Sequence, residues 1–161
     1  MEKAIANRYA VRSYAPDKLD SGQVEDLIAA FQASPCGMGQ ADVMQGIVVE
    51  DDSLLDQIES AVNGAGYNAP LLFILATKKD SNFGERDASV AAENIMVEAA
   101  AHGLGSVYVM GGAISLNQHP DLLQKLGVKD GFQVTTIVPV GKAANQSAAP
   151  DRSHRYQLIR K

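Results

Sequence analysis

Cysteine and long apolar runs are both scarce in this sequence. Only one of its 161 residues is cysteine, Cys36, which excludes an internal disulfide framework and is typical of a reducing compartment. No apolar run approaches the roughly 20 residues that a membrane-spanning helix needs. The first residues, Met1 to Ile5, lack the apolar core of a secretory signal peptide. We therefore expect a cytoplasmic protein with no membrane partner.

Basic residues and the common ligand-binding motifs are also few. Fourteen lysines and arginines against 19 acidic residues give a net charge of -5, which argues against nucleic acid as a partner. No Gly-x-Gly-x-x-Gly stands between a strand and a helix, and no Walker-type Gly-Lys-Ser is present. The three histidines, His102, His119 and His154, are scattered without cysteine or carboxylate partners at ligand spacing. The sequence therefore predicts no metal site.

What the sequence does contain is the pattern of one layered domain over residues 1–161. Hydrophobic residues make up 46% of the chain, enough for a core without metals or disulfides. Apolar spacing predicts helices at Gly22–Ala33, Ser53–Val62, Asp87–His102 and Pro120–Leu126. Apolar runs predict strands at Ile47–Val49, Leu71–Ala76, Leu104–Met110 and Phe132–Val140. Helices and strands alternate, which indicates a sheet covered by helices in two or three layers.

The chain after Gly141 does not fit this pattern. It is rich in alanine, asparagine, serine and proline, and it is too long and too sparsely apolar to pack on its own core. A tail over residues 142–161 that wraps a second subunit would explain this composition.

Arginines gather at the two chain ends. Five of the six lie in the first twelve or the last ten residues: Arg8, Arg12, Arg152, Arg155 and Arg160. Guanidinium groups bind planar anionic groups with two hydrogen bonds, so both ends could serve one anion. Arg8 and Arg12 are four residues apart and could face the same ligand. The simpler interpretation is that terminal arginines are only solvated.

Two glycine pairs suggest contact with a flat ligand. Gly37 and Gly39 follow Pro35, and Gly111-Gly112 follows a predicted strand, so backbone N–H groups there are free of an obstructing Cβ. Ordinary turn chemistry explains both pairs equally well. Cys36 has no recognisable histidine partner for nucleophilic chemistry. Glu93 on a predicted buried helix is more typical of a paired residue at a core edge than of a catalytic base. We nominate no catalytic side chain.

The order of these features resembles the nitroreductase family of FMN-dependent enzymes. Asn7–Tyr14 is similar to the family's Arg-Arg-Ser-Val-Arg-x-Phe signature, and Ala33–Gln40 is similar to its Ala-Pro-Ser/Thr-Gly-Met-Asn segment. The most specific match is Asp87–Ser106, with Glu-Asn-Ile-Met inside it and Gly-Leu-Gly-Ser at its end. Ala69-Pro70 and Val138–Gly141 complete a resemblance that spans the whole chain.

The resemblance implies an α+β fold: a nitroreductase-like three-layer sandwich with a mixed central sheet flanked by helices. It also implies a homodimer that exchanges its tails and binds FMN at the subunit interface. Arg8 would hold the FMN phosphate together with Arg152 or Arg155. Arg12 would lie toward the ribityl chain and the N1/O2 edge of the ring, where a cation stabilises developing negative charge. The remaining cofactor-binding residues implied are Tyr9, Ala10, Cys36, Gly37, Met38, Met110, Gly111 and Gly112.

The function implied is an oxidoreductase that passes hydride from NADH or NADPH through flavin N5 to a nitroaromatic, quinone or similar small-molecule acceptor. Two alternatives stay open. One is a flavin-binding or scaffold protein of the same fold with little turnover, which two departures favour: Ala10 stands where the family usually has serine, and the usual Asn-x-Gln-Pro-Trp after Gly39 is missing. The other is an α/β domain that binds no cofactor.

Overall fold

The longest apolar run of the sequence forms a central strand of the sheet. In the computed structural model, which describes residues 1–145 and 147–161, this run is β2 (Leu71–Lys78). The other strands are β1 (Met44–Val49), β3 (Gly105–Ser106) and β4 (Phe132–Gly141), and the strand order is β1-β2-β4-β3. All three ladders are antiparallel. Among the described residues, the parallel component of the expected mixed sheet is one isolated bridge, between Ala10 and Ser106.

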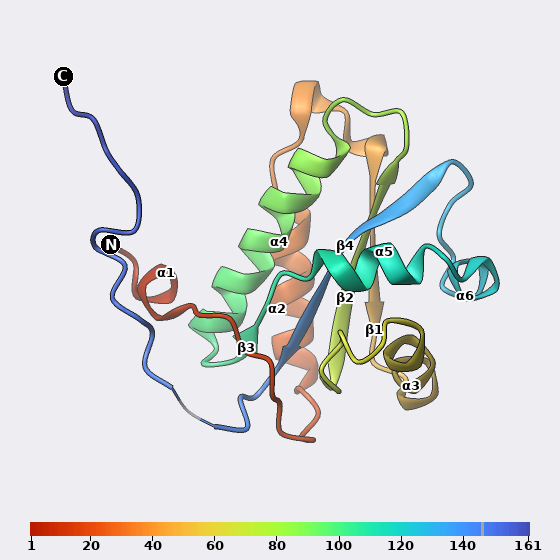
Figure 1. Cartoon of the computed structure of the whole chain (residues 1–161), viewed down its shortest axis with the longest axis horizontal. Coiled ribbons are helices and arrows are strands. Elements are labelled where there is room, and N and C mark those ends of the chain that lie inside the picture. The colour runs from red at the N-terminus through yellow and green to blue at the C-terminus, as the bar shows by residue number, and fades with distance from the viewer. Residues whose placement is uncertain (146) are drawn as a thin grey trace.

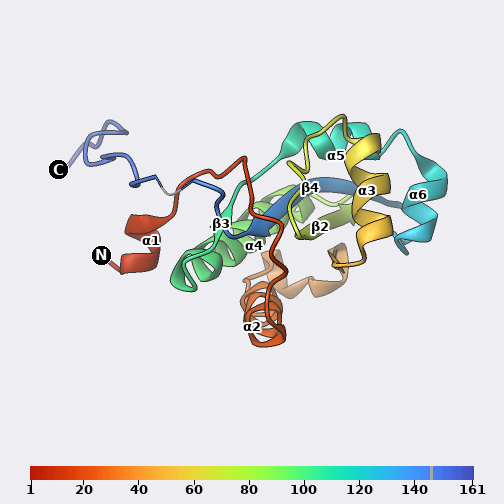
Figure 2. The same ribbon diagram turned by 90° about the horizontal axis from the view of Figure 1, so that it is seen from below.

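Helices cover both faces of this sheet (Figures 1 and 2). Side chains alternate along β2, so Phe73 and Leu75 pack with α2 (Ser21–Gln32) and α4 (Gly84–Ala101). Leu72 and Ile74 point the other way, toward α3 (Asp52–Ala61) and α5 (Met110–Leu116). The two apolar clusters form a three-layer sandwich. The remaining elements are α1 (Lys3–Asn7), α6 (Pro120–Lys125) and two 3₁₀ turns, Gly37–Gly39 and Ala41–Val43.

The N-terminus of α2 forms the capping box that its sequence predicts. The Asp20 carboxylate accepts a hydrogen bond from the Gln23 backbone N–H at 2.9 Å. In return, the Asp20 backbone N–H donates to the Gln23 side-chain oxygen at 3.2 Å. Two N–H groups that the first helical turn would otherwise leave unpaired are thereby satisfied.

The predicted helix over Asp87–His102 is α4, but it is not buried all round. Ala88, Ala91, Ala92 and Ile95 are fully buried against the sheet and α2. Another face is open: Val90 is 43% exposed, and Glu93 is exposed one turn further on. The sequence therefore overstated the burial of this helix, because the face that carries Val90 and Glu93 is exposed in the described chain.

The predicted strand over Leu104–Met110 is wrong beyond its first residues. Only Gly105–Ser106 pairs as a strand, and Met110 begins α5. Val107 and Val109 turn into the core between the sheet and α5, and Val109 forms only an isolated bridge to Ile137. Gly111 and Gly112 therefore lie in the first turn of a helix and not in the turn that the sequence predicted.

The tail lies beside α1 and extends away from the sandwich (Figures 1 and 2). Its start is held by an antiparallel bridge from Ala143 to Tyr14. Further along, Tyr156, Leu158 and Ile159 are each more than 70% exposed, and none of the described residues from 142 onward is buried. No helix of the described chain has the length and apolarity to cross a membrane.

Candidate functional site

Three of the predicted cofactor-binding arginines line one hollow. Arg8, Arg152 and Arg155 surround a space of about 520 Å³ between α1, α4 and the tail. The guanidinium of Arg152 donates to the backbone carbonyl of Ala6, which holds the tail against α1. Residues nearly 150 positions apart in the sequence thus present their positive charge to the same space.

Arg8 is oriented by an acidic residue of α4. Its Nε lies 3.1 Å from Oε1 of Glu93, and the Arg8 side chain is 22% exposed. This Nε is buried, and no described atom meets it in hydrogen-bond geometry, so the contact with Glu93 is electrostatic. The interpretation of Glu93 as a paired residue is confirmed, with Arg8 as its partner. An ion pair at Nε leaves the terminal nitrogens of Arg8 to meet an anion.

A second hollow of about 840 Å³ adjoins the first and shares Arg8 with it. Its lining includes Tyr9, Ser106, Lys142 and Ser147. The phenol oxygen of Tyr9 accepts a hydrogen bond from the Ser147 backbone N–H at 3.2 Å, so the tail also closes this hollow. Both volumes fall in the range of roughly 300–1,000 Å³ that is typical of small-molecule sites.

Lys142 and Ser106 were not among the residues predicted from the sequence. Lys142 directly follows the last strand, at Gly141, and its charge was an available signal. Ser106 offered no such signal, because its place beside the N-terminal segment depends on the bridge from Ala10.

The segment from Ala10 to Tyr14 runs along the edge of the sheet. Val11 is buried against Gly105, where an added Cβ would lie 2.5 Å from a Val11 methyl group. Its neighbours Ala10 and Arg12 are both exposed. The hydroxyl of Tyr14 lies 2.8 Å from the Val11 carbonyl oxygen and fixes this turn of the chain. Burial raises the pKa of Tyr14 well above its ordinary value, and the nearby charge of Arg12 opposes that shift only in part.

The Cys36–Met38 loop lies apart from the arginine hollows. It follows α2, at the end where α4 begins, and lines neither hollow (Figure 1). The Gly37 backbone N–H donates to both carboxylate oxygens of buried Asp87, at 3.0 and 3.1 Å. Met38 adopts a left-handed backbone conformation with φ of 54°, and its side chain is 83% exposed. The contact with Asp87 therefore holds the loop in place, and the side chain of Met38 is exposed.

The third predicted segment, Met110–Gly112, opens α5 and also lines neither hollow. Met110 and Ile114, one turn apart, are 59% and 64% exposed. A Cβ added at Gly111 would meet nothing within 4 Å, so its backbone is open to a ligand. Gly112, in contrast, packs tightly on Ile137. Within one chain, the structure therefore unites the arginines but not the two glycine segments.

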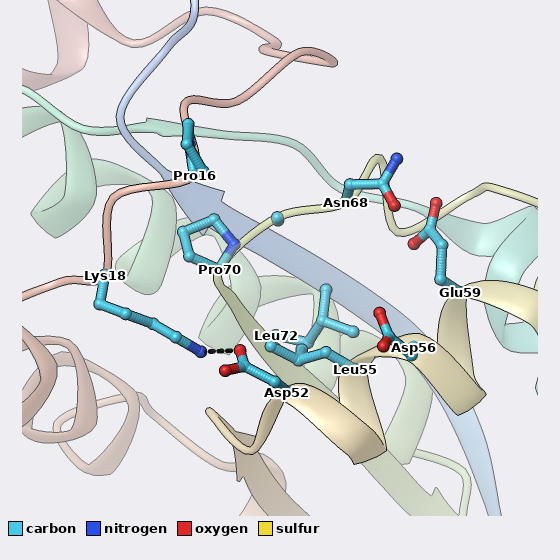
Figure 3. Close-up of a pocket in the computed structure, with 10 residues that line it drawn as sticks. Pro16, Lys18, Asp52, Leu55, Asp56, Glu59, Asn68, Pro70 and Leu72 are labelled. Carbon is cyan, nitrogen blue, oxygen red and sulfur yellow. Dashed lines mark hydrogen bonds and ion pairs between the residues drawn. The ribbon is translucent and has the colours of Figure 1, made fainter.

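A smaller hollow of about 180 Å³ lies beside α3 and has the opposite charge (Figure 3). Asp52, Asp56 and Glu59 point into it, and Lys18 forms an ion pair with Asp52. Two carboxylates without a cationic partner in the described chain would repel a phosphate. This hollow shares no lining residue with the arginine hollows and does not suit an anionic cofactor.

Comparison with known proteins agrees with the fold. The model of the nitroreductase family matches residues 43–142. A protein of Archaeoglobus fulgidus, provisionally named NADH dehydrogenase/NAD(P)H nitroreductase, is 25% identical, and the match covers 95% of each chain. A nitroreductase with bound FMN from Desulfitobacterium hafniense has a TM-score of 0.84 at 16% identity, covering 98% of this chain and 97% of its own.

A second crystal structure, a nitroreductase with bound FMN from Bacteroides fragilis, also has a TM-score of 0.84. It is 17% identical, and the match covers 99% of this chain and all of the other. At such identities the two structures show the fold alone. They confirm the predicted α+β three-layer fold.

Proposed function

The chain belongs to the nitroreductase family, and from this premise we propose that it is an FMN-dependent oxidoreductase. The observation that carries the proposal is the meeting of Arg8, Arg152 and Arg155 around one hollow in a chain of net charge -5. The three guanidinium groups outnumber the carboxylates of Glu93 and Asp151 in the same lining, and their N–H groups suit the dianionic phosphate of FMN as charge-assisted donors. The relatives with bound FMN support this choice of anion.

Each residue of the proposed site has a role that its position supports. Arg8 holds the phosphate, with Glu93 fixing the direction of its side chain, and Arg152 and Arg155 close over it from the tail. Arg12, exposed beyond Val11, reaches toward the ribityl chain and the N1/O2 edge of the ring. Tyr9 lines the second hollow, and Ala10 is the exposed residue that follows it. When bound, FMN would supply the redox chemistry, by which a hydride from NADH or NADPH would be carried on to the acceptor and the acceptor's further proton would come from water.

The ring would lie between two copies of the chain. In one protomer the Cys36–Met38 loop is distant from the arginine hollows, so we place the loop of a second copy against the flavin of the first. Apolar side chains exposed on several elements support such an interface: Ile5, Met38, Val90, Met110, Ile114, Tyr156, Leu158 and Ile159. Backbone groups of Gly37 and Gly111 would then line the ring. The tail over residues 142–161 would complete the homodimer.

The proposal names the electron acceptor as a chemical class and not as a single compound. Nitroaromatics, quinones and similar flat electron acceptors can stack on an exposed flavin, and the relatives' names include NAD(P)H as reductant. A flavin-binding scaffold with little turnover is the second candidate, and a specific observation favours it. Ala10 and Gly39 carry no polar side chain with which to bind the cofactor.

Flavin binding is tested by the visible absorption spectrum of the purified protein before and after addition of FMN and desalting. We expect retained flavin bands in the wild type and a roughly tenfold or greater loss of FMN affinity in Arg8→Gln, since one charge-assisted contact is worth about 1.5–3 kcal/mol. Arg86→Gln is the matched control, because Arg86 is exposed near the start of α4 and, among the described residues, its one hydrogen bond is to the Asn82 carbonyl. A colourless wild type that retains no added FMN would refute the proposal.

Turnover is tested by anaerobic mixing of the FMN-loaded protein with NADH and, separately, with NADPH. Loss of the oxidised flavin bands within seconds, and their return on addition of a quinone, is the result expected of a reductase. A flavin that stays oxidised for minutes with both reductants would leave the scaffold as the better description.

A further inference from the structure

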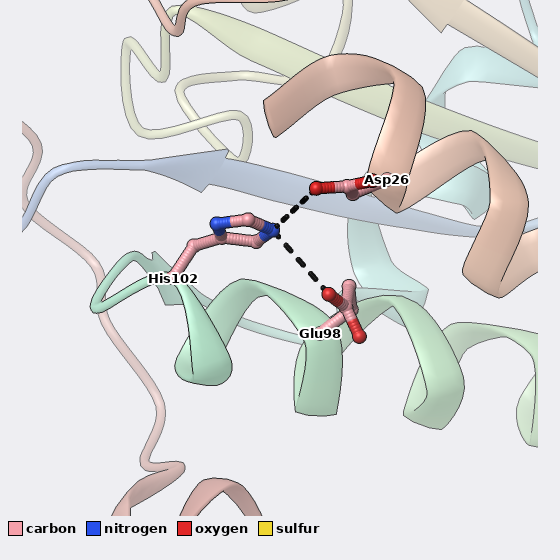
Figure 4. A group of neighbouring side chains, drawn as sticks. All are labelled: Asp26, Glu98 and His102. Atoms are coloured by element: carbon pink, nitrogen blue, oxygen red, sulfur yellow. Dashed lines mark ion pairs between the residues drawn. The ribbon is translucent and has the colours of Figure 1, made fainter. Parts of the chain in front are cut away.

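A histidine and two carboxylates meet where α2 and α4 pack together (Figure 4). Glu98 and His102 stand four residues apart at the end of α4, so their side chains share one face of the helix. Asp26 approaches from the middle of α2. None of the three lines the arginine hollows, and the proposed flavin chemistry gives them no role.

The imidazole Nε2 of His102 is directed between both carboxylates. It lies 3.1 Å from Oδ2 of Asp26 and 3.3 Å from Oε1 of Glu98. The atom is buried, yet neither oxygen nor any other described atom meets it in hydrogen-bond geometry. A single N–H can be shared between two oxygens, but here neither oxygen lies in hydrogen-bond geometry, so this arrangement leaves a buried polar atom without a directed partner.

A divalent ion would satisfy all three groups together. Their ligand atoms lie within 4.8 Å of one another. Ligands about 2.0–2.2 Å from a zinc-sized ion stand roughly 3.0–3.6 Å apart, which agrees with the two measured distances to Nε2. Two carboxylates neutralise the charge of the ion, and an imidazole beside them favours a transition metal over magnesium or calcium.

We propose that Asp26, Glu98 and His102 bind a divalent transition-metal ion of the zinc class, with water completing its coordination. The ion would cross-link α2 to α4 on the side of the sandwich that these helices cover. The expectation that no histidine has a carboxylate at ligand spacing is wrong for His102, because Glu98 precedes it by four residues. Asp26 could not be foreseen, since only the packing of the two helices brings it to them. The inference is independent of flavin binding.

The test is calorimetric titration of the metal-free full chain with zinc chloride near neutral pH, with cobalt absorption as a second readout. We expect one ion per chain and a zinc-dependent rise in melting temperature, because an ion that binds only the folded state stabilises it. In His102→Gln the affinity should fall by roughly tenfold or more. His119→Gln is the matched control, since this exposed histidine belongs to another part of the surface.

The Asp26→Asn variant distinguishes loss of the metal site from a folding defect, because Asp26 is exposed and asparagine has the same shape as aspartate. This variant should fold and lose the zinc-dependent stabilisation. No binding by the wild type would overturn the proposal and leave only the contacts of His102 with the two carboxylates. Binding of equal strength in His102→Gln would overturn it as well.

Discussion

At the scale of single residues, Gly37 shows how closely the loop after α2 fits its surroundings. Its N–H donates to Asp87, and a Cβ at this position would lie 2.6 Å from the Phe83 ring near its attachment point. We expect Gly37→Ala to lower the free energy of unfolding by about 1–3 kcal/mol, measured by urea denaturation. Gly111→Ala is the control, because nothing lies within 4 Å of its added methyl group. Equal stability of the two variants would contradict the fit described here.

Tyr14 gives the stability of the protein a specific dependence on alkaline pH. Its hydroxyl contacts the Val11 and Pro139 carbonyl oxygens, and burial raises its pKa. The folded state therefore holds the phenol neutral at a pH where the unfolded chain already ionises, so its contribution is complete below about pH 10 and is lost as the pH rises further.

We expect Tyr14→Phe to cost about 1 kcal/mol near neutral pH, and the difference from the wild type to shrink above about pH 10. Urea denaturation at a series of pH values measures both effects. A difference that does not change with pH would show that Tyr14 titrates normally.

Residue-level predictions from the sequence succeeded where charge was the signal. Three of the five arginines at the two chain ends, Arg8, Arg152 and Arg155, line one hollow, whereas Arg12 and Arg160 line neither arginine hollow. Whether they bind a cofactor stays a prediction. Ser106 ends the Gly-Leu-Gly-Ser motif, but its place at the second hollow could not be predicted, because it depends on a long-range bridge that no local pattern encodes.

At the scale of elements, α2 depends on the capping box at its start. We expect Asp20→Ala to lower the free energy of unfolding by about 1 kcal/mol, because it removes the acceptor for the Gln23 N–H. Asp17→Ala is the matched control, since Asp17 is exposed in the preceding loop and outside the helix. Thermal unfolding of the two variants checks this, and equal melting temperatures would count against the cap.

Strong periodicity identified most elements in advance, and their ends were accurate to within a few residues. The helices α1 and α5 were not predicted, and Leu104–Met110 has the apolar residues of a strand but turns into a helix at Met110. Apolar composition could not reveal this turn, because the core between the sheet and α5 is what draws Val107 and Val109 inward. Whether such a segment pairs as a strand or packs its side chains into the core depends on the whole fold.

At the scale of the whole molecule, the sandwich over residues 1–141 does not depend on the tail over residues 142–161 for its core. β4 ends at Gly141, and no described residue after it is buried. A chain ending at Gly141 should therefore keep the far-ultraviolet circular dichroism of the wild type, yet lose dimerisation and FMN retention, measured by analytical ultracentrifugation and absorption. A chain ending at Ile159 is the control. A stable, flavin-loaded monomer from the shorter chain would refute the proposed role of the tail.

The exposed tail also bears on how long a copy of the protein survives. Lys142, Arg152, Arg155 and Arg160 offer cleavage points for trypsin-like proteases in a segment where no described residue is buried. Cleavage there would leave the sandwich intact and remove the arginines that close over the hollow. A copy whose tail is covered by a partner subunit would be protected from cleavage. Proteolysis would therefore act mainly on copies without a partner subunit.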